Sequence, residues 1–120
     1  MGDLGKYFNK HEFECKCGCG KIDMGKNFIS KLDLAREISD TSYVINSGYR
    51  CESHNDAVGG KSDSAHLKGL AADIKATDSR KKFNVIKGLI EAGFNRIGID
   101  KEFIHVDFDD TKDKDVIWLY

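Results

Sequence analysis

The spacing between His66 and Asp73 is the feature that most restricts how this chain can fold. The stretch SAHLKGLAADIKA, residues 64–76, sets the two side chains seven positions apart across a run of small residues. They are too far apart for neighbouring turns of one helix, which excludes the H-E-x-x-H arrangement of helical zinc peptidases. A loop-borne histidine and a strand-borne aspartate converge instead if the chain turns back at Gly69. We therefore predict that the pair meets at a junction between a loop and a strand.

The fragment EFIHVDF, residues 102–108, offers a third side chain for the same site. His105 is favoured over the two remaining histidines because neighbouring strands lie about 5 Å apart and hold their side chains rigidly. Two histidines and one aspartate match the ligand count of a catalytic zinc, which keeps a fourth position open. The alternative is that His66 is a buried hydrogen-bonded residue and Asp73 is a capping residue.

Two segments have the apolar periodicity of helices. Residues 26–39 are predicted to be helical, with Asn27 as the cap. Residues 77–93 are predicted to form a helix that begins at Asp78 and ends at Gly93 in a left-handed conformation. The expected inward-facing residues are Phe28, Leu32, Ala35 and Ile38 in the first helix and Phe83, Ile86, Leu89 and Ile90 in the second.

Several short segments have the composition of strands. We predict strands at 42–47 and 70–76, a hairpin formed by 96–99 and 103–108, and an edge strand within the charged and then apolar tail. The segment SGYRCESHNDAVGGKSDSAH has no period, and a long irregular segment in a small domain is usually functional. These elements indicate an α+β domain.

Length and charge exclude several classes of protein. The 120 residues suit one domain, and a net charge of −1 with scattered basic residues does not indicate a nucleic-acid partner. No stretch approaches the ~20 apolar residues of a membrane span, and the amino terminus lacks the apolar core of a secretory signal. We expect a monomer that is cytoplasmic as synthesised, without a membrane or nucleic-acid partner.

Four cysteines are the unusual part of the composition: Cys15, Cys17, Cys19 and Cys51. The alternating C-x-C-x-C spacing differs from the C-x2-C knuckles of zinc ribbons, and a cytoplasmic protein does not form disulfides by default. We expect ordinary, partly buried thiols. A structural metal and a disulfide that includes Cys51 are the alternatives.

The stretch SGYRCESHNDAVGGKSDSAHLKGLAADI resembles the zinc D-Ala-D-Ala carboxypeptidases and the phage L-alanyl-D-glutamate endopeptidases, which share their fold with the hedgehog signalling domain. The similarity covers residues 11–109. It rests on four motifs in order: SGYR, HN followed by GG, S-x-H-x-x-G-x-A-x-D, and FIHVD. The resemblance implies a single zinc peptidase domain over residues 1–120, with a small antiparallel sheet flanked by helices.

The same resemblance assigns roles to individual residues. It implies one catalytic Zn²⁺ held by His66, Asp73 and His105. Arg50 matches an arginine that faces the substrate, where a guanidinium group binds a carboxylate through two parallel hydrogen bonds. Ser64 matches a serine that lines the same site. The alternatives are a surface ion pair for Arg50 and a turn position for Ser64.

Two carboxylates compete for the role of general base. Relatives with the pattern Glu-x-x-His use the glutamate three residues before the last ligand, and Glu102 holds that position. Strand alternation instead favours Asp107, because it shares a face with His105. Glu102 directly follows a turn, where strand alternation need not hold, and it has the longer side chain. We therefore predict that Glu102 is the base and that Asp107 orients a metal ligand.

These features together predict a zinc-dependent peptidase that cleaves peptidoglycan stem peptides, either as a carboxypeptidase or as an endopeptidase. The resemblance to phage enzymes favours a phage or prophage lysin that acts on the cell wall after release. The alternative is a recognition module of the same fold that binds zinc but has lost hydrolysis. A second alternative is a domain in which the three ligands are merely polar core residues.

Overall fold

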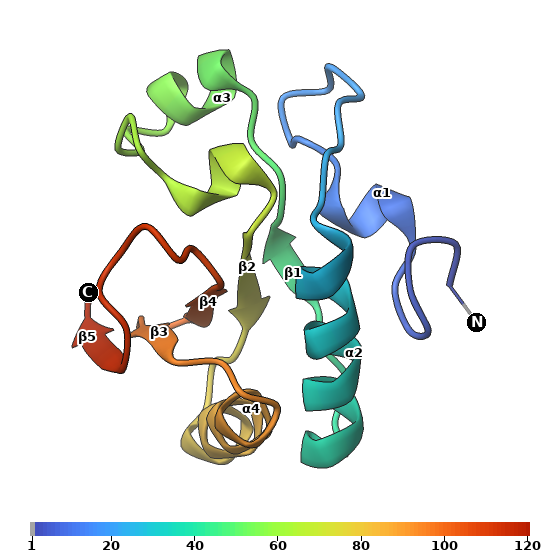
Figure 1. The fold of residues 1–120 in the computed structure, drawn as a ribbon, viewed down its shortest axis with the longest axis vertical. Helices are drawn as coiled ribbons and strands as arrows, with labels where there is room; N and C mark the ends of the chain where they lie inside the picture. Colours follow the sequence, from blue (N-terminus) through green and yellow to red (C-terminus); the bar gives the residue numbers. More distant parts are fainter. Residues whose placement is uncertain (1) are drawn as a thin grey trace.

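The computed structural model describes residues 2–120 and contains a five-stranded mixed sheet packed against helices (Figure 1). In chain order the elements are α1 (Lys10–Phe13), α2 (Lys26–Ser39), β1 (Ile45–Ser47), α3 (Glu52–Ala57), the 3₁₀-helix η1 (Ala65–Lys68), β2 (Ala71–Lys75), α4 (Ser79–Glu91), β3 (Arg96–Ile99), β4 (Phe103–Asp107) and β5 (Val116–Leu119). The predicted α+β class with helices flanking a small sheet is confirmed.

The sheet is mixed rather than wholly antiparallel as predicted. Its strand order is β1-β2-β4-β3-β5, and each neighbouring pair is antiparallel except β3 and β5. After β4 the chain reverses direction, but β5 lies on the far side of β3 instead of beside β4. Because β3 already runs opposite to β4, β5 must run parallel to β3.

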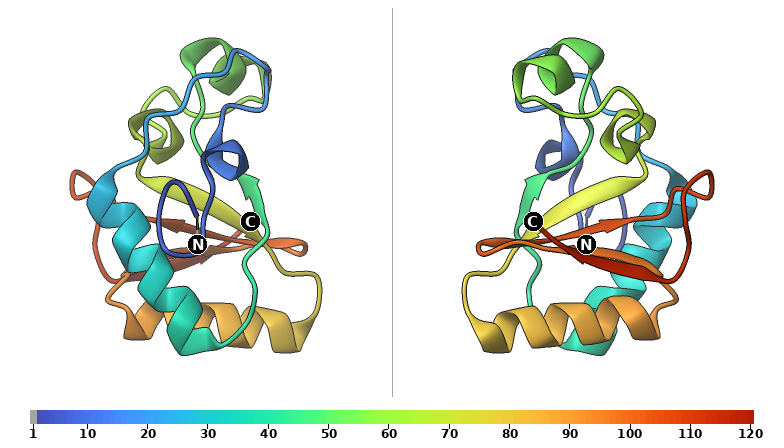
Figure 2. Two further views of the ribbon diagram at one scale, coloured as in Figure 1. Left: turned by 90° about the vertical axis from the view of Figure 1, so that its right-hand side faces the viewer. Right: turned by 90° about the vertical axis from the view of Figure 1, so that its left-hand side faces the viewer.

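The central strands β2 and β4 are covered on both faces. Figure 2 shows α4 on one side of the C-terminal strands, with α3 and η1 on the other. Alternate residues of the two strands join the apolar core with α2 and α4: Ala72, Ile74, Ile104 and Val106. The intervening residues of both strands point to the opposite face, where three of the buried side chains are polar: Asp73, His105 and Asp107.

Helix α2 has the predicted bounds, but its cap differs from the prediction. The N-cap residue is Gly25 in an extended conformation, and Asn27 lies exposed inside the first turn. The predicted apolar stripe is correct for Phe28, Leu32 and Ala35, which are fully buried, whereas Ile38 is only partly buried.

Helix α4 begins as predicted, since Asp78 accepts a hydrogen bond from the Lys81 amide, and Gly93 follows it with φ +102°. The predicted buried face is partly wrong because Phe83 is 66% exposed and Ile90 is 51% exposed. The helix turns Val85, Gly88 and Leu89 inward instead. A Cβ at Gly88 would lie 2.4 Å from the Ala35 carbonyl oxygen, so this glycine lets α4 approach α2 closely.

The segment between β1 and β2 is more regular than its sequence indicates. It contains α3 and η1, although the sequence predicts no secondary structure there. The preceding strand, predicted over 42–47, is confined to Ile45–Ser47. Within residues 2–120, no helix combines the length and the apolar character needed to cross a bilayer.

Candidate metal centre

Asp73 and His105 meet because the register of the sheet places them opposite each other. Asp73 of β2 pairs with His105 of antiparallel β4. Both are buried, and Asp73 Oδ1 lies 2.9 Å from His105 Nδ1. The two strand-borne residues predicted to bind metal are therefore held by backbone pairing as well as by their own contact.

His66 reaches the same point from η1. Ser64 caps this short helix by accepting a hydrogen bond from the His66 amide, and Gly69 ends it with φ +70°. A Cβ at Gly69 would lie 1.7 Å from the Asp23 carbonyl oxygen, so the turn requires glycine. The predicted fold-back at Gly69 is confirmed, and it leaves His66 Nε2 3.4 Å from Asp73 Oδ1.

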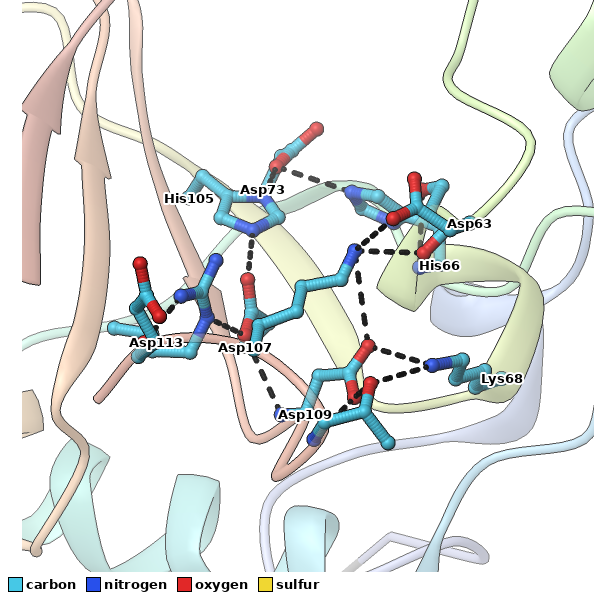
Figure 3. A network of polar contacts seen from close by, with 12 residues as sticks. Asp63, His66, Lys68, Asp73, His105, Asp107, Asp109 and Asp113 are labelled. Carbon is cyan, nitrogen blue, oxygen red and sulfur yellow. Dashed lines mark hydrogen bonds and ion pairs between the residues drawn. The ribbon is translucent and has the colours of Figure 1, made fainter.

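The second ring nitrogen of each histidine faces an acceptor that fixes the orientation of the ring, and Figure 3 shows this contact between His105 and Asp107. His66 Nδ1 lies 2.7 Å from the Gly48 carbonyl oxygen, so it donates a hydrogen bond and leaves Nε2 available. His105 Nε2 lies 2.8 Å from Asp107 Oδ2, which leaves Nδ1 facing Asp73. Metal-binding histidines commonly have such an acceptor behind them.

The donor atoms of His66, Asp73 and His105 lie within 4.8 Å of one another. Two imidazole nitrogens and one carboxylate oxygen suit zinc, and three protein ligands match an open catalytic site rather than a closed structural one. The structure thus brings together the three residues predicted to hold the metal.

The electrostatics of the cluster favour a carboxylate that is ready to bind a cation. Burial raises the pKa of Asp73, but hydrogen bonds from His105 and His66 outweigh it and hold the pKa well below its usual range. Burial lowers the pKa of His105, but its hydrogen bonds with Asp107 and Asp73 raise it overall. Asp73 is therefore held ionised beside the two imidazole rings, and the ionised carboxylate is the form that binds a cation.

A cavity of about 460 Å³ opens over these three residues. Its basic lining residues are Arg50, Lys61, Arg96 and Lys112, its aromatic ones are Phe103, Trp118 and Tyr120, and small residues of the 59–65 segment complete the wall. Asp73 and Asp107 contribute acidic groups. Cationic and aromatic groups around the candidate metal centre suit a ligand that carries both a carboxylate and apolar groups.

Arg50 lies at this site, as predicted. Its Nη2 is 3.8 Å from Asp73 Oδ2, and its backbone amide donates to the His66 carbonyl oxygen. The side chain is only 16% exposed, so it is not the surface ion pair considered as an alternative. The guanidinium group therefore borders both the metal cluster and the open cavity.

Asn55 is a functional candidate that the sequence reasoning missed. It is 1% exposed, its Oδ1 accepts a hydrogen bond from Arg50 Nη1, and its Nδ2 donates to the Lys61 carbonyl oxygen. A Cβ at Gly60 would lie 2.1 Å from Asn55 Oδ1. The HN and GG parts of the motif thus form one unit that positions Arg50, and the motif was the available signal.

Arg96 and Trp118 were also missed. Arg96 Nε donates to Asp107 Oδ1 at 2.6 Å, and its guanidinium group lies 5.1 Å from the centre of the Trp118 ring. The Trp118 ring is 5.6 Å from the ring of His105. No local pattern could have revealed this cluster, because it depends on the pairing of β5 with β3.

The structure does not bring Glu102 into the cluster. Glu102 is exposed in the turn before β4, and among residues 2–120 it is not part of the cavity wall. Its amide donates to Asp100 Oδ2 and its carbonyl oxygen accepts from the Ala76 amide. Its predicted role as the base, like that of Ser64 in binding substrate, stays a prediction.

Lys68 and Asp109 connect the two sides of the site. Lys68, at the end of η1, places Nζ 2.9 Å from Oδ2 of Asp109, which follows β4 and is 1% exposed. The Phe108 amide also donates to the Leu70 carbonyl oxygen. These contacts fix the helix that carries His66 against the strand that carries His105.

The chain was compared with known protein families. The family described as peptidase M15 matches over residues 6–107, which include all the residues discussed above except those of the carboxyl-terminal segment. Comparison with curated proteins gives no match.

Proposed function

Because the chain belongs to the peptidase M15 family, we propose that it is a zinc-dependent peptidase that hydrolyses peptide bonds in the stem peptides of peptidoglycan. The observation that carries this proposal is the convergence of His66, Asp73 and His105 beneath an open cavity with basic and aromatic walls. When bound, zinc supplies a Lewis acid that polarises a peptide carbonyl and makes water more acidic. The three residues would hold it.

The cavity supports a substrate with a free carboxylate. Arg50 lies beside the metal ligands, and its guanidinium fork suits a carboxylate through two parallel hydrogen bonds. Lys61 adds a second cationic group to the same wall. Stem peptides are short, contain D-residues and carry several carboxylates, so they match this arrangement. Trp118 and Tyr120 supply apolar surface beside it.

The position of Asp107 supports a role in orientation rather than as the base. Its carboxylate already faces both His105 and Arg96. Burial raises the pKa of Asp107, but these hydrogen bonds outweigh it and lower the pKa overall. An acceptor that is already engaged and weakly basic is poorly suited to take a proton from water.

Glu102 is the remaining candidate for the base, as the Glu-x-x-His pattern implies. Its carboxylate accepts no hydrogen bond from the described residues, and the next residue, Phe103, lines the cavity. The side chain is exposed and must turn over the rim to approach the site. If it does not, the cavity fits the alternative function, a module that binds its ligand without cleaving it.

Digestion of purified peptidoglycan followed by mass spectrometry of the products tests the proposal. We expect new termini either between L-Ala and D-Glu or next to a terminal D-Ala, and the products identify which bond is cut. His66→Ala should abolish cleavage, whereas His11→Ala, which changes an exposed histidine outside the cavity, should not. Intact peptidoglycan after incubation with zinc-loaded protein would favour the binding module.

We extend this proposal to a lysin of phage or prophage type, since the resemblance includes phage endopeptidases. Such an enzyme reaches the wall after release from the cell interior. The expected result is a loss of turbidity when the protein is added to cells with an exposed wall. Cells that remain intact while purified peptidoglycan is cleaved would restrict the protein to a housekeeping role.

A further inference from the structure

The four cysteines converge at a second site, away from the cavity. Cys15 Sγ lies 3.4 Å from Cys17 Sγ and 3.6 Å from Cys51 Sγ, and Cys17 Sγ lies 3.7 Å from Cys51 Sγ. All four sulfur atoms, including that of Cys19, lie within 4.8 Å of one another. The fold therefore gathers thiols that are up to 36 positions apart in sequence.

The sulfur separations fit a metal better than a disulfide. A tetrahedral zinc–thiolate site with bonds of about 2.3 Å places its sulfur atoms about 3.8 Å apart. A disulfide requires about 2.05 Å and joins only two sulfurs. Three of the observed separations lie near the tetrahedral value, and none of the four cysteines is bonded to another.

The backbone around the cysteines also supports a metal site. The Cys51 amide donates a hydrogen bond to Cys15 Sγ at 3.4 Å, a contact that stabilises a thiolate. Gly18 and Gly20, which follow Cys17 and Cys19, have φ of +87° and +75°. These left-handed residues turn the C-x-C-x-C segment tightly enough for alternate residues to present their sulfurs to one point.

We propose that Cys15, Cys17, Cys19 and Cys51 bind one structural zinc ion. Binding replaces four S–H bonds with four Zn–S bonds and releases four protons, so the site carries a charge of −2. Four protein ligands leave no open position, which distinguishes this site from the one formed by His66, Asp73 and His105. The sequence favours ordinary thiols, because the alternating C-x-C-x-C spacing does not resemble a zinc knuckle. The local spacing gives no sign of the fourth ligand, since Cys51 comes from a distant segment.

The location of the site gives it a mechanical role. In Figure 1 the loop between α1 and α2 lies close to the segment that connects β1 to α3. Cys51 is the N-cap residue of α3 and directly follows Arg50. A metal bound there would fasten the amino-terminal segment to the residue beside the substrate-facing arginine. The proposal does not depend on peptidase activity.

Metal analysis of the full chain, purified under reducing conditions without chelator, tests the proposal directly. We expect about two zinc ions per chain, of which His66→Ala removes one and Cys19→Ser removes the other. After replacement of zinc by cobalt, we expect the intense thiolate-to-cobalt charge-transfer absorption in the wild type and in His66→Ala. That absorption should be absent in Cys19→Ser.

Two matched variants separate metal binding from side effects of substitution. Cys19→His offers a different zinc ligand at the same exposed position and should keep the ion. Lys16→Ser changes a neighbouring exposed residue and should keep both the ion and the cobalt spectrum.

A measurement on the wild type alone tests the proposal even if the cysteine variants do not fold. Stepwise modification of the thiols with a mercurial reagent should release one zinc ion per four thiols, detected with a metallochromic dye. The proposal is overturned by unchanged zinc content in Cys19→Ser, by the absence of the charge-transfer band, or by release of no zinc during modification. Two free thiols instead of four in the denatured, unreduced chain would show a disulfide.

Discussion

Asp73 and His105 face each other across β2 and β4, with Asp73 Oδ1 2.9 Å from His105 Nδ1. Asp73→Asn keeps the shape of this side chain but removes the negative charge that a metal would neutralise. We expect loss of zinc from this site and a fall in peptidase activity of more than about 100-fold. Substitution of a residue that only hydrogen-bonds to a metal ligand already lowers metal affinity or activity by about 10–100-fold. Metal analysis and product release measure both effects. Asp56→Asn, at an exposed position in α3, should change neither.

Glu102 and Asp107 are predicted to have different roles, so substitution of one should lower kcat and substitution of the other should lower zinc affinity. Glu102→Gln should lower kcat by about 10²–10⁴-fold with zinc retained, as expected for a general base. Asp107→Asn should weaken zinc binding by about 10–100-fold, because the neutral amide has one acceptor oxygen and cannot accept from both Arg96 Nε and His105 Nε2. Kinetics at saturating zinc, together with zinc titration, separate the two effects. Near-full turnover of Glu102→Gln beside an inactive Asp107→Asn would reverse the assignment.

The parts of the site that local patterns encode could be predicted from sequence. Helix α2 has the predicted bounds because its apolar stripe follows the helical period. The hairpin of β3 and β4 follows from two short β-prone runs joined by three residues. The motif S-x-H-x-x-G-x-A-x-D located His66 and Asp73, and the glycine within it is required by the turn that brings them together.

The parts that depend on distant contacts could not be predicted. β5 brings Trp118 to His105 only because it pairs with β3, and nothing in the tail itself encodes that partner. The cysteines were expected to be ordinary thiols, with a structural metal or a disulfide that includes Cys51 as alternatives, because Cys51 joins the C-x-C-x-C segment only in three dimensions. Phe83 was placed in the core because helical periodicity identifies an apolar face but not the neighbour that covers it.

Asn55 is predicted to position Arg50 and the loop that includes Lys61. Asn55→Ala would remove two part-buried side-chain hydrogen bonds, which costs about 1–3 kcal/mol of unfolding free energy. Because Arg50 is proposed to bind the substrate carboxylate, we also expect KM to rise more than kcat falls. Urea unfolding and steady-state kinetics measure these changes. Asn27→Ala, at an exposed position in α2, is the matched control, and equal behaviour of the two variants would contradict the role.

Gly98 is predicted to be required by the packing of Trp118. Gly98 pairs with His105 on one side and with Trp118 on the other, and a Cβ there would lie 2.6 Å from Trp118 Nε1. Gly98→Ala should therefore displace the indole and cost about 1–3 kcal/mol of stability. Trp118 is the only tryptophan in the chain, so its fluorescence reports the displacement directly. An unchanged emission spectrum and unchanged stability would show that the indole does not pack there.

The pairing of Asp109 with Lys68 predicts a stability contribution that depends on pH. Burial raises the pKa of Asp109, but hydrogen bonds from Thr111 and Lys68 outweigh it and lower the pKa from 3.8 to about 2. The folded state thus favours the ionised carboxylate, and the stabilisation is fully present above pH 4 and is lost as the pH falls towards 2. A shift of this size corresponds to at most about 2 kcal/mol, and we expect about 1 because the Lys68 side chain is 39% exposed.

Asp109→Asn removes this contribution, so the variant should be less stable than the wild type at neutral pH. The difference in unfolding free energy should be constant from about pH 7 to pH 5 and should shrink below pH 4, because the wild-type carboxylate then becomes protonated as well. Urea unfolding at a series of pH values measures it. Asp110→Asn changes the neighbouring exposed carboxylate and should show little difference at any pH. A difference for Asp109→Asn that stays the same down to pH 2 would mean that the residue acts through its shape and not through its charge.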